Sequence, residues 1–393
     1  MRDFTYYTPT KVVFGRGTEN RVSELVKEFG GRKLLLHYGG GSVIRSGLLD
    51  RVKRILEEEG IPYVCLGGVV PNPRLSLVYQ GIELCRREGV DFILAVGGGS
   101  VIDSAKAIGY GVTNEGDVWD FFEKKRKAKG CLPLGVILTL SATGSEMSSS
   151  CVITKEEGWL KRGYGSDYAR PGFAILNPEL TMTLPEYQTS CGCTDIMMHT
   201  MERYFSAVGN MELTDRLAEG LLCTVMENAR ILLQEPDNYE ARAEVMWAGS
   251  LAHNGLTGCG GDGGDWMPHK LEHEIGGMFD VAHGAGLAAV WGSWARYVYR
   301  GCLPRFKSFA VKVMKVSEEG SDEEIALRGI KAMEDFYREI KMPVNLKELG
   351  IAPSEEELKE MAHKCALGVG GASGSARVLR EGDMYEVLKA ALE

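Results

Sequence analysis

The chain has 393 residues, of which 44% are hydrophobic and 25% charged, an ordinary composition for a globular protein of two or three domains. Its net charge of −9 argues against nucleic acid and anionic membranes as partners, and no stretch is long and apolar enough to span a bilayer. The ten cysteines include no C-x-x-C pair, and no apolar segment typical of secretion follows Met1. We therefore expect reduced thiols and a cytoplasmic location.

The N-terminal half alternates short apolar runs with segments of helical periodicity. We predict strands at Thr10–Phe14, Lys33–Tyr38, Tyr63–Leu66, Phe92–Val96, Leu134–Leu140 and Phe173–Leu176. We predict helices at Glu19–Phe29, Leu48–Glu59, Leu75–Glu88 and Ser100–Ile108. Apolar strands that alternate with helices predict a parallel sheet covered on both faces.

The second half of the chain is helical, with almost no strand signal after about Thr189. The predicted helices are Thr194–Phe205, Leu213–Leu233, Tyr239–Asn254, His269–Met278, Gly284–Tyr299, Glu323–Ile340, Ser354–Cys365 and Asp383–Leu392. Pro185 favours a helix start. We therefore predict a dinucleotide-binding α/β domain of residues 1–184 and an all-helical metal-binding domain of residues 185–393.

Two junctions of strand, glycines and helix are candidates for nucleotide binding. They contain Gly39, Gly40, Gly41 and Ser42, and Gly97, Gly98, Gly99 and Ser100. Glycines let backbone N–H groups approach a phosphate, and a following helix N-terminus favours an anion. Neither junction matches G-x-G-x-x-G, and one alone would usually be a simple tight turn, but two in one sheet favour a dinucleotide.

The first junction also bears on the choice of cofactor. An acidic side chain near the end of this strand would bind the ribose 2′-hydroxyl of NAD and repel the 2′-phosphate of NADP. Here the region holds only glycines and Ser42, with Arg45 shortly after. The sequence therefore favours NADP(H) over NAD(H).

Five of the seven histidines lie between His199 and His283. Asp195 and His199 are four residues apart, as are His269 and His273, so a helix places each pair on one face. One carboxylate and several imidazoles suit Zn²⁺ or Fe²⁺. A single histidine on such a helix would usually be a core residue, but this set predicts a metal site. The spacing leaves open whether His269 or His273 is the ligand.

The combined motifs resemble the iron-containing (group III) alcohol dehydrogenases, close to the NADP(H)-dependent butanol dehydrogenase branch. The motifs are Lys11–Gly15 (KVVFG), Gly97–Lys106 (GGGSVIDSAK), Ala142–Glu146 (ATGSE), Asp195-x3-His199-x2-Glu202, and His269, His273 and His283. The resemblance covers essentially the whole chain. It implies a Rossmann-like α/β domain followed by an all-α domain, a dehydroquinate synthase-like fold, and a homodimer.

The resemblance also implies roles for individual residues. The implied metal ligands are Asp195, His199, His269 and His283. His273 would lie beside the metal as a non-ligand that relays a proton, and Lys161 joins it as a candidate catalytic residue. The implied cofactor contacts are Gly98, Gly99, Ser100 and Asp103 at the pyrophosphate and nicotinamide ribose, Thr139, Thr143 and Lys161 at the nicotinamide half, and Asn72 near the adenosine.

These features predict hydride transfer between NADP(H) and a small primary alcohol or aldehyde, such as butanol or butanal, assisted by one Fe²⁺ or Zn²⁺. Three alternatives remain open. The first is an enzyme of related fold that acts on a polyol or a phosphorylated substrate, like glycerol dehydrogenase or dehydroquinate synthase. Between Leu251 and His283 the only basic residue besides histidine is Lys270, which disfavours an anionic substrate. The others are a metal-dependent hydrolase and a metal-binding protein without catalysis.

Overall fold

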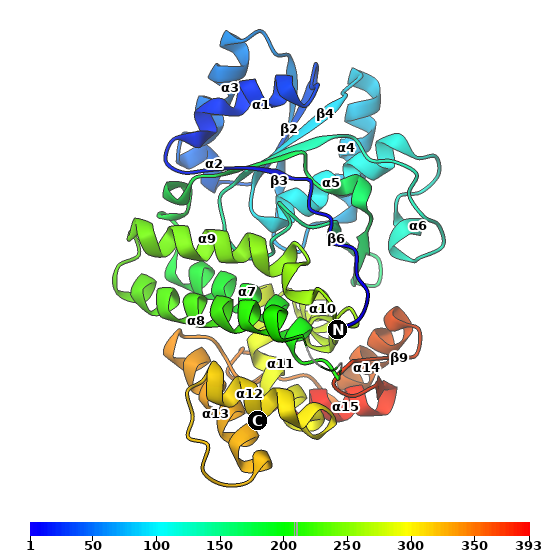
Figure 1. Cartoon of the computed structure of the whole chain (residues 1–393). Coiled ribbons are helices and arrows are strands. Elements are labelled where there is room, and N and C mark those ends of the chain that lie inside the picture. Colours follow the sequence, from blue (N-terminus) through cyan, green and yellow to red (C-terminus); the bar gives the residue numbers. More distant parts are fainter. Residues whose placement is uncertain (208, 210) are drawn as a thin grey trace. The chain divides into compact units, whose positions relative to one another are not determined.

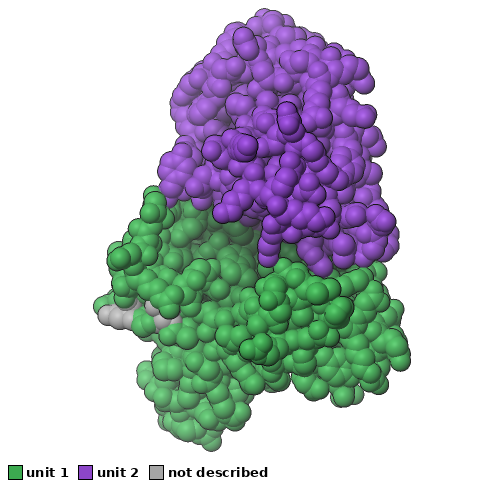
Figure 2. Space-filling view, turned by 90° about the vertical axis from the view of Figure 1, so that its right-hand side faces the viewer, with its two compact units in different colours: residues 1–6, 185–393 green, residues 7–184 purple. Residues whose placement is uncertain are grey.

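The computed structural model describes residues 1–207, 209 and 211–393, and the chain divides into two compact units. Unit 2 is Tyr7–Leu184, and unit 1 is Pro185–Glu393 together with Met1–Tyr6 (Figure 2). The first six residues thus join the helical part of the chain, where the backbone N–H of Arg2 donates to the carbonyl of Gly260 at 2.9 Å. The sequence pattern gave no sign of this association.

Unit 2 is built on a six-stranded parallel sheet in the order β1-β8-β5-β4-β2-β3 (Figure 1). Its strands are β1 (Lys11–Phe14), β2 (Leu34–Gly39), β3 (Tyr63–Val69), β4 (Phe92–Gly97), β5 (Leu134–Leu138) and β8 (Phe173–Leu176). Its helices are α1 (Val22–Glu28), α2 (Ser42–Arg45), α3 (Leu48–Glu58), α4 (Leu75–Glu88), α5 (Gly99–Thr113) and α6 (Trp119–Phe122).

Helices cover both faces of this sheet because its strands are apolar on both sides. Alternate residues of β2 and β4, such as Leu36 and Leu94, pack with Leu25 of α1 and Val52 of α3 in one hydrophobic core. The intervening residues, among them Ile93, are also fully buried, and α5 contacts β2, β4 and β5. The predicted parallel sheet with two covered faces is therefore confirmed.

The strand order places both glycine turns at one point of the sheet. β3 lies on one side of β2, whereas β4 and all later strands of the sheet lie on the other side. Ligands of open α/β sheets bind outside the carboxyl ends of the strands, where the order reverses in this way. The turns that follow β2 and β4 flank that point. Only the second leads directly into a long helix, because α2 after the first turn has four residues.

An antiparallel ribbon, absent from our sequence predictions, follows the fifth strand of the sheet. It consists of β6 (Ser150–Lys155) and β7 (Leu160–Gly165), with Thr154 opposite Lys161. The backbone N–H of Thr154 donates to the carbonyl of Pro73 at 2.8 Å. Polar residues interrupt the apolar runs of both strands, which explains why periodicity did not reveal them.

Unit 1 is almost entirely helical. Its helices are α7 (Glu186–Tyr204), α8 (Glu212–Gln234), α9 (Tyr239–His253), α10 (Met267–Phe279), α11 (His283–Val298), α12 (Leu303–Lys312), α13 (Asp322–Glu339), α14 (Glu355–Val369) and α15 (Glu381–Ala390). Two short strands, β9 (Ala372–Ser373) and β10 (Leu379–Arg380), pair with each other. We did not predict α12. Within the described ranges, no helix has the length and apolar character needed to cross a membrane.

A buried histidine connects the sheet to α5. His37 of β2 is fully buried; its Nδ1 lies 2.9 Å from the carbonyl oxygen of Leu66, and its Nε2 lies 2.9 Å from the hydroxyl of Ser104. The ring donates to the carbonyl and accepts from the hydroxyl, so it is neutral. Burial lowers the pKa of His37 to about 4, although the bond to Leu66 opposes the shift.

His37 is therefore expected to make the fold acid-sensitive. The unfolded chain binds a proton at this histidine below about pH 6.5, whereas the folded chain binds it only near pH 4. The contribution of His37 to the free energy of unfolding is fully present above about pH 6.5. It is lost as the pH drops towards 4, by about 2 kcal/mol between pH 7 and 5. Urea unfolding at both pH values should show this loss, and in the variant His37→Gln the loss should be smaller by that amount. An equal loss in both proteins would contradict the assignment.

Candidate active site

Three helices of unit 1 bring the predicted metal ligands together. Asp195 and His199 lie one turn apart on α7, His269 lies on α10, and His283 is the first residue of α11. One nitrogen of each histidine approaches the same atom, Oδ1 of Asp195, at 3.4 Å for His199, 3.5 Å for His269 and 3.7 Å for His283. The ligand atoms of Asp195, His199 and His269 all lie within 4.8 Å of one another.

Two buried glutamates hold the imidazoles in place. Glu202 accepts hydrogen bonds from Nδ1 of His269 and, at 2.9 Å, from its backbone N–H. Glu272 accepts from Nδ1 of His283. Both carboxylates are fully buried. Such a carboxylate fixes the tautomer of a histidine and directs its other nitrogen towards a metal, here the Nε2 atoms that face Asp195.

The residues fit a divalent cation. Oδ1 of Asp195, Nδ1 of His199 and Nε2 of His269 are buried atoms without a hydrogen-bond partner among the described residues. Buried polar atoms are seldom left unpaired, so three that face one another form a site suited to a cation. A donor set of one carboxylate and three imidazoles suits Fe²⁺ or Zn²⁺ rather than Mg²⁺ or Ca²⁺.

The ionisation of the cluster agrees with its geometry. Burial alone would raise the pKa of Asp195, but the neighbouring histidines, His199 first, hold it well below its usual range. Burial drives the pKa of His199 well below its ordinary value. Burial also acts to lower the pKa of His269, yet Glu202 and Asp195 together raise it to about 9. A negative charge at the centre of the cluster would attract a cation.

His273 borders this cluster without entering it. Its buried ring lies 6.4 Å from the ring of His269 and 6.1 Å from that of His283, measured between centroids. Since His269 is the residue that reaches Asp195, the geometry favours His269 over His273 as a ligand. The proposed proton relay through His273 stays a prediction.

Three residues outside the predicted site, Glu202, Glu272 and His253, also shape the cluster. Glu202 and Glu272 each lie three residues after a predicted ligand on its helix, a spacing that could have revealed them. His253, the last residue of α9, packs its ring edge-on against His199 with a centroid distance of 4.0 Å. No spacing signal pointed to His253, because α9 is far from α7 in sequence.

In unit 2 the structure brings five predicted cofactor contacts together. Gly98 and Gly99 lie at the start of α5, followed by Ser100. The backbone N–H of Thr139 donates to the carbonyl of Gly97 at 3.1 Å. A Cβ atom on Gly99 would lie 2.4 Å from the side chain of Thr143, so glycine is required there for Thr143 to cover the turn.

The other predicted contacts have different surroundings. Both carboxylate oxygens of Asp103 accept hydrogen bonds within the protein, from the hydroxyl of Ser145 at 2.6 Å and the backbone N–H of Val152 at 2.9 Å. Lys161 is buried on β7, and Asn72 is buried with a φ angle of 53°. The ribbon brings these two near each other, since Thr154 pairs with Lys161 and binds Pro73.

The first glycine turn is less closely covered by side chains than the second turn. Gly40 would accept a Cβ atom without any contact, whereas a Cβ on Gly41 would lie 2.3 Å from Nη1 of Arg45. The exposed guanidinium of Arg45 therefore lies against the turn that contains Gly39, Gly40, Gly41 and Ser42.

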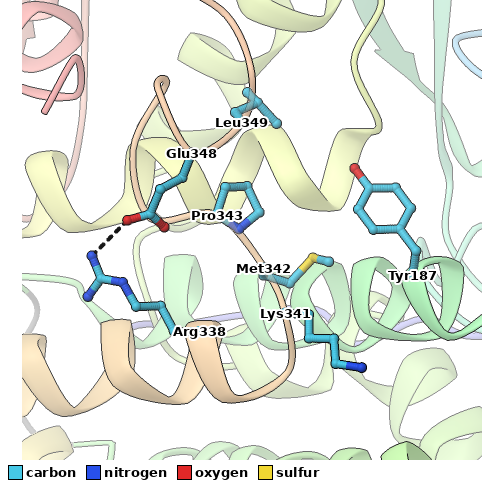
Figure 3. A pocket seen from close by; sticks show the side chains of 7 residues that line it. All are labelled: Tyr187, Arg338, Lys341, Met342, Pro343, Glu348 and Leu349. Carbon is cyan, nitrogen blue, oxygen red and sulfur yellow. Dashed lines mark hydrogen bonds and ion pairs between the residues drawn. The ribbon is translucent and has the colours of Figure 1, made fainter.

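Unit 1 also has a surface cavity of about 400 Å³ whose lining includes none of the predicted ligands (Figure 3). It is lined by Tyr187, Arg338, Lys341, Met342, Pro343, Glu348 and Leu349. The ion pair between Arg338 and Glu348, 3.0 Å long, closes one side. Met342 contacts the thiol of Cys191, which lies one helical turn before Asp195. The cavity is therefore linked to α7 without being part of the histidine cluster.

Two family models together match most of the chain. Residues 9–178 match the family described as iron-containing alcohol dehydrogenase, and residues 189–392 match the C-terminal region of the Fe-containing alcohol dehydrogenase family. A probable NADH-dependent butanol dehydrogenase 2 of Bacillus subtilis (strain 168) is 44% identical over 401 residues, with 100% of both chains covered. An NADPH-dependent aldehyde reductase of Escherichia coli (strain K12) is 36% identical over 354 residues, 89% of this chain and 90% of that protein.

A solved structure is similar to the chain over its full length. The crystal structure of NADH-dependent butanol dehydrogenase A from Thermotoga maritima superimposes with a TM-score of 0.96 at 40% identity, covering 100% of this chain and 99% of that chain. The predicted fold class and the predicted family are both confirmed. The chain belongs to the iron-containing alcohol dehydrogenases and is an oxidoreductase of that family.

Proposed function

We propose that the chain transfers a hydride between NADP(H) and a small primary alcohol or aldehyde of the butanol and butanal type. The proposed ligands of one Fe²⁺ or Zn²⁺ are Asp195, His199, His269 and His283. The observation that carries this proposal is the convergence of three histidine nitrogens on Oδ1 of Asp195, within 3.7 Å. A bound divalent ion would act as a Lewis acid on the substrate oxygen.

The residues of the chain supply orientation and protons. Glu202 and Glu272 keep the Nε2 atoms of His269 and His283 directed towards Asp195. His273 is the proposed group that gives a proton to the product oxygen when an aldehyde is reduced. In unit 2, the amides of Gly98, Gly99 and Ser100 would bind the pyrophosphate at the start of α5. Thr139, Thr143 and Lys161 would contact the nicotinamide half, and Asn72 the adenosine.

Asp103 has a less direct role in this proposal. Its two oxygens already accept bonds from Ser145 and Val152, so we assign it to the support of the turn.

The test is an assay of NADPH oxidation over a series of short aldehydes. The metal-stripped protein should be inactive, and Fe²⁺ or Zn²⁺ should restore turnover. Oxidation of NADPH at the same rate with and without metal would refute the metal-dependent mechanism. Failure of the protein to bind either NADPH or NADH would refute the whole proposal.

The family match reduces support for the metal-dependent hydrolase and for the metal-binding protein without catalysis. A polyol or phosphorylated substrate remains a secondary candidate, and glycerol, 1,3-propanediol and glycerol 1-phosphate belong in the substrate screen. The ten cysteines are free thiols in the structure, which supports the proposed cytoplasmic location. We also propose a homodimer, which sedimentation would test.

The preference for NADP(H) rests on Arg45. Two relatives named above are called NADH-dependent and one NADPH-dependent, so the names alone do not decide the cofactor. The guanidinium of Arg45 lies against Gly41, in a turn without an acidic side chain, where it would pair with a 2′-phosphate.

Replacing Arg45 by glutamine is therefore expected to weaken NADPH binding roughly tenfold to a hundredfold and to leave NADH binding unchanged. Arg54→Gln on α3, also an exposed arginine, is the matched control. Fluorescence titration of both cofactors measures the effect. An equal change for NADPH and NADH would contradict the role of Arg45.

A further inference from the structure

The helix that follows the second glycine turn contains a fully buried lysine. Lys106 is two helical turns after Gly99 on α5, and its side chain has no exposed surface. Its Nζ donates to three backbone carbonyls, at 2.7 Å to Ser145, 2.9 Å to Ser148 and 2.8 Å to Ser150. The hydroxyls of Ser145 and Ser148 lie at 2.9 and 3.4 Å.

This geometry requires an ammonium ion. An ammonium group has three N–H donors, which equals the number of carbonyls around Nζ, whereas a neutral amine would leave one carbonyl without a donor. Burial lowers the pKa of Lys106, and the charge of Asp103 opposes that shift. A buried charge is stable only when its surroundings satisfy it, as the carbonyls do here.

The segment that Lys106 binds is also held by Asp103, one turn earlier on the same helix. Asp103 accepts the hydroxyl proton of Ser145 and the backbone N–H of Val152. Ser145 therefore lies between the two charged groups: its hydroxyl donates to Asp103 and its backbone carbonyl accepts from Lys106. Together the two side chains fix both ends of residues 145–152 against α5.

The same segment positions Thr143. The backbone N–H of Ser145 donates to Oγ1 of Thr143 at 3.2 Å, and Gly144 between them has a φ angle of 60°. Thr143 in turn covers Gly99, whose Cβ position it occupies. A continuous chain of contacts thus runs from Nζ of Lys106 through Ser145 and Thr143 to the N-terminus of α5.

We propose that Lys106 is a positioning residue whose ammonium group holds residues 143–150 over the second glycine turn and thereby sets the affinity for the nicotinamide cofactor. This proposal rests on the proposed function, since it assigns cofactor binding to that turn. It predicts an effect on cofactor affinity without an effect on the metal site, whose donors belong to unit 1.

The test compares Lys106→Met and Lys106→Ala with the parent protein by fluorescence titration of NADPH. We expect binding to weaken roughly tenfold to a hundredfold in both variants. Metal content after reconstitution should be unchanged, and turnover at saturating NADPH should fall much less than the affinity. Lys53→Met, a partly exposed lysine of α3, is the matched control.

Chemical rescue distinguishes positioning by charge from a general loss of packing. Lys106→Ala removes three methylenes and the ammonium group, so 1-propylammonium should restore NADPH binding, whereas tetramethylammonium at equal ionic strength should not. Binding is measured rather than turnover, because a primary amine would condense with the aldehyde substrate.

Unchanged NADPH binding in Lys106→Met would overturn the proposal, as would a folded Lys106→Ala variant that propylammonium does not rescue. If these variants do not fold, Ser145→Ala provides the test, with several-fold weaker NADPH binding expected and unchanged binding contradicting it. A parent protein that binds neither NADPH nor NADH would refute the proposed function rather than the role of Lys106.

Discussion

The variant His269→Ala is expected to lose the proposed metal and at least about a thousandfold of the proposed aldehyde reductase activity. Nε2 of His269 lies 3.5 Å from Oδ1 of Asp195, and its Nδ1 donates to Glu202. Alanine removes one proposed ligand and leaves the buried carboxylate of Glu202 without that donor, so metal affinity falls. A Lewis acid contributes several kcal/mol to such a reaction, which corresponds to a factor of this size.

The measurement combines metal analysis of the purified variant with NADPH oxidation. His363→Ala is the matched control, because His363 is an exposed histidine of α14 that pairs with Glu381 at 3.2 Å. The control should retain metal and activity. His269→Ala should still bind NADPH, since the proposed nucleotide contacts belong to unit 2. Full turnover by a metal-free His269→Ala protein would remove the assignment of this cluster as the catalytic metal site.

The fold of unit 2 could be predicted because its strands are buried on both faces. β8 and α4 begin and end at the predicted residues, and the other sheet strands differ by a few residues at their ends. The ribbon of β6 and β7 escaped prediction, because polar residues interrupt the apolar runs of both strands and the strands depend on pairing with each other. The attachment of Met1–Tyr6 to unit 1 is a tertiary contact that no local pattern encodes.

In the candidate site, too, local spacing predicts some features, whereas others depend on tertiary contacts. The i,i+4 spacing of Asp195 and His199 predicts a shared face of α7, and the structure shows both side chains in one cluster. Spacing could not choose between His269 and His273, since both lie on the buried side of α10. That choice depends on contacts between side chains of α7 and α10, in which His269 meets both Glu202 and Asp195. Similarly, nothing local indicates that Lys106 is bonded to residues about forty positions later.

The close approach of α7 and α11 yields a second prediction with a large effect. A Cβ atom on Gly284 would lie 2.2 Å from the carbonyl oxygen of Cys191 and 2.8 Å from its Cα atom. These are backbone atoms of α7 and cannot rotate away. Gly284 follows His283 directly, and Cys191 lies four residues before Asp195 on α7, so the contact sets the distance between two proposed ligands.

Gly284→Ala should therefore separate the helices and move His283 away from Asp195. We expect weaker metal binding and a loss of turnover on the order of a hundredfold, since a shift of about 1 Å at a reacting centre has that effect. Chelator competition measures the metal affinity, and NADPH oxidation at saturating metal measures the turnover.

Two other glycines calibrate the effect of Gly284→Ala. A Cβ on Gly286 would lie 2.9 Å from Cγ of Glu272, a longer distance and to a side-chain rather than a backbone atom, so Gly286→Ala should have a smaller effect, transmitted to His283 through Glu272. A Cβ on Gly220 of α8 would meet no atom within 4 Å. Gly220→Ala should retain activity and stabilise its helix by about 1 kcal/mol.

Wild-type metal affinity and turnover in Gly284→Ala would show that the position of His283 does not depend on the contact between Gly284 and Cys191. A graded loss from Gly220 through Gly286 to Gly284 would show that the spacing of α7 and α11 sets the geometry of the proposed metal ligands.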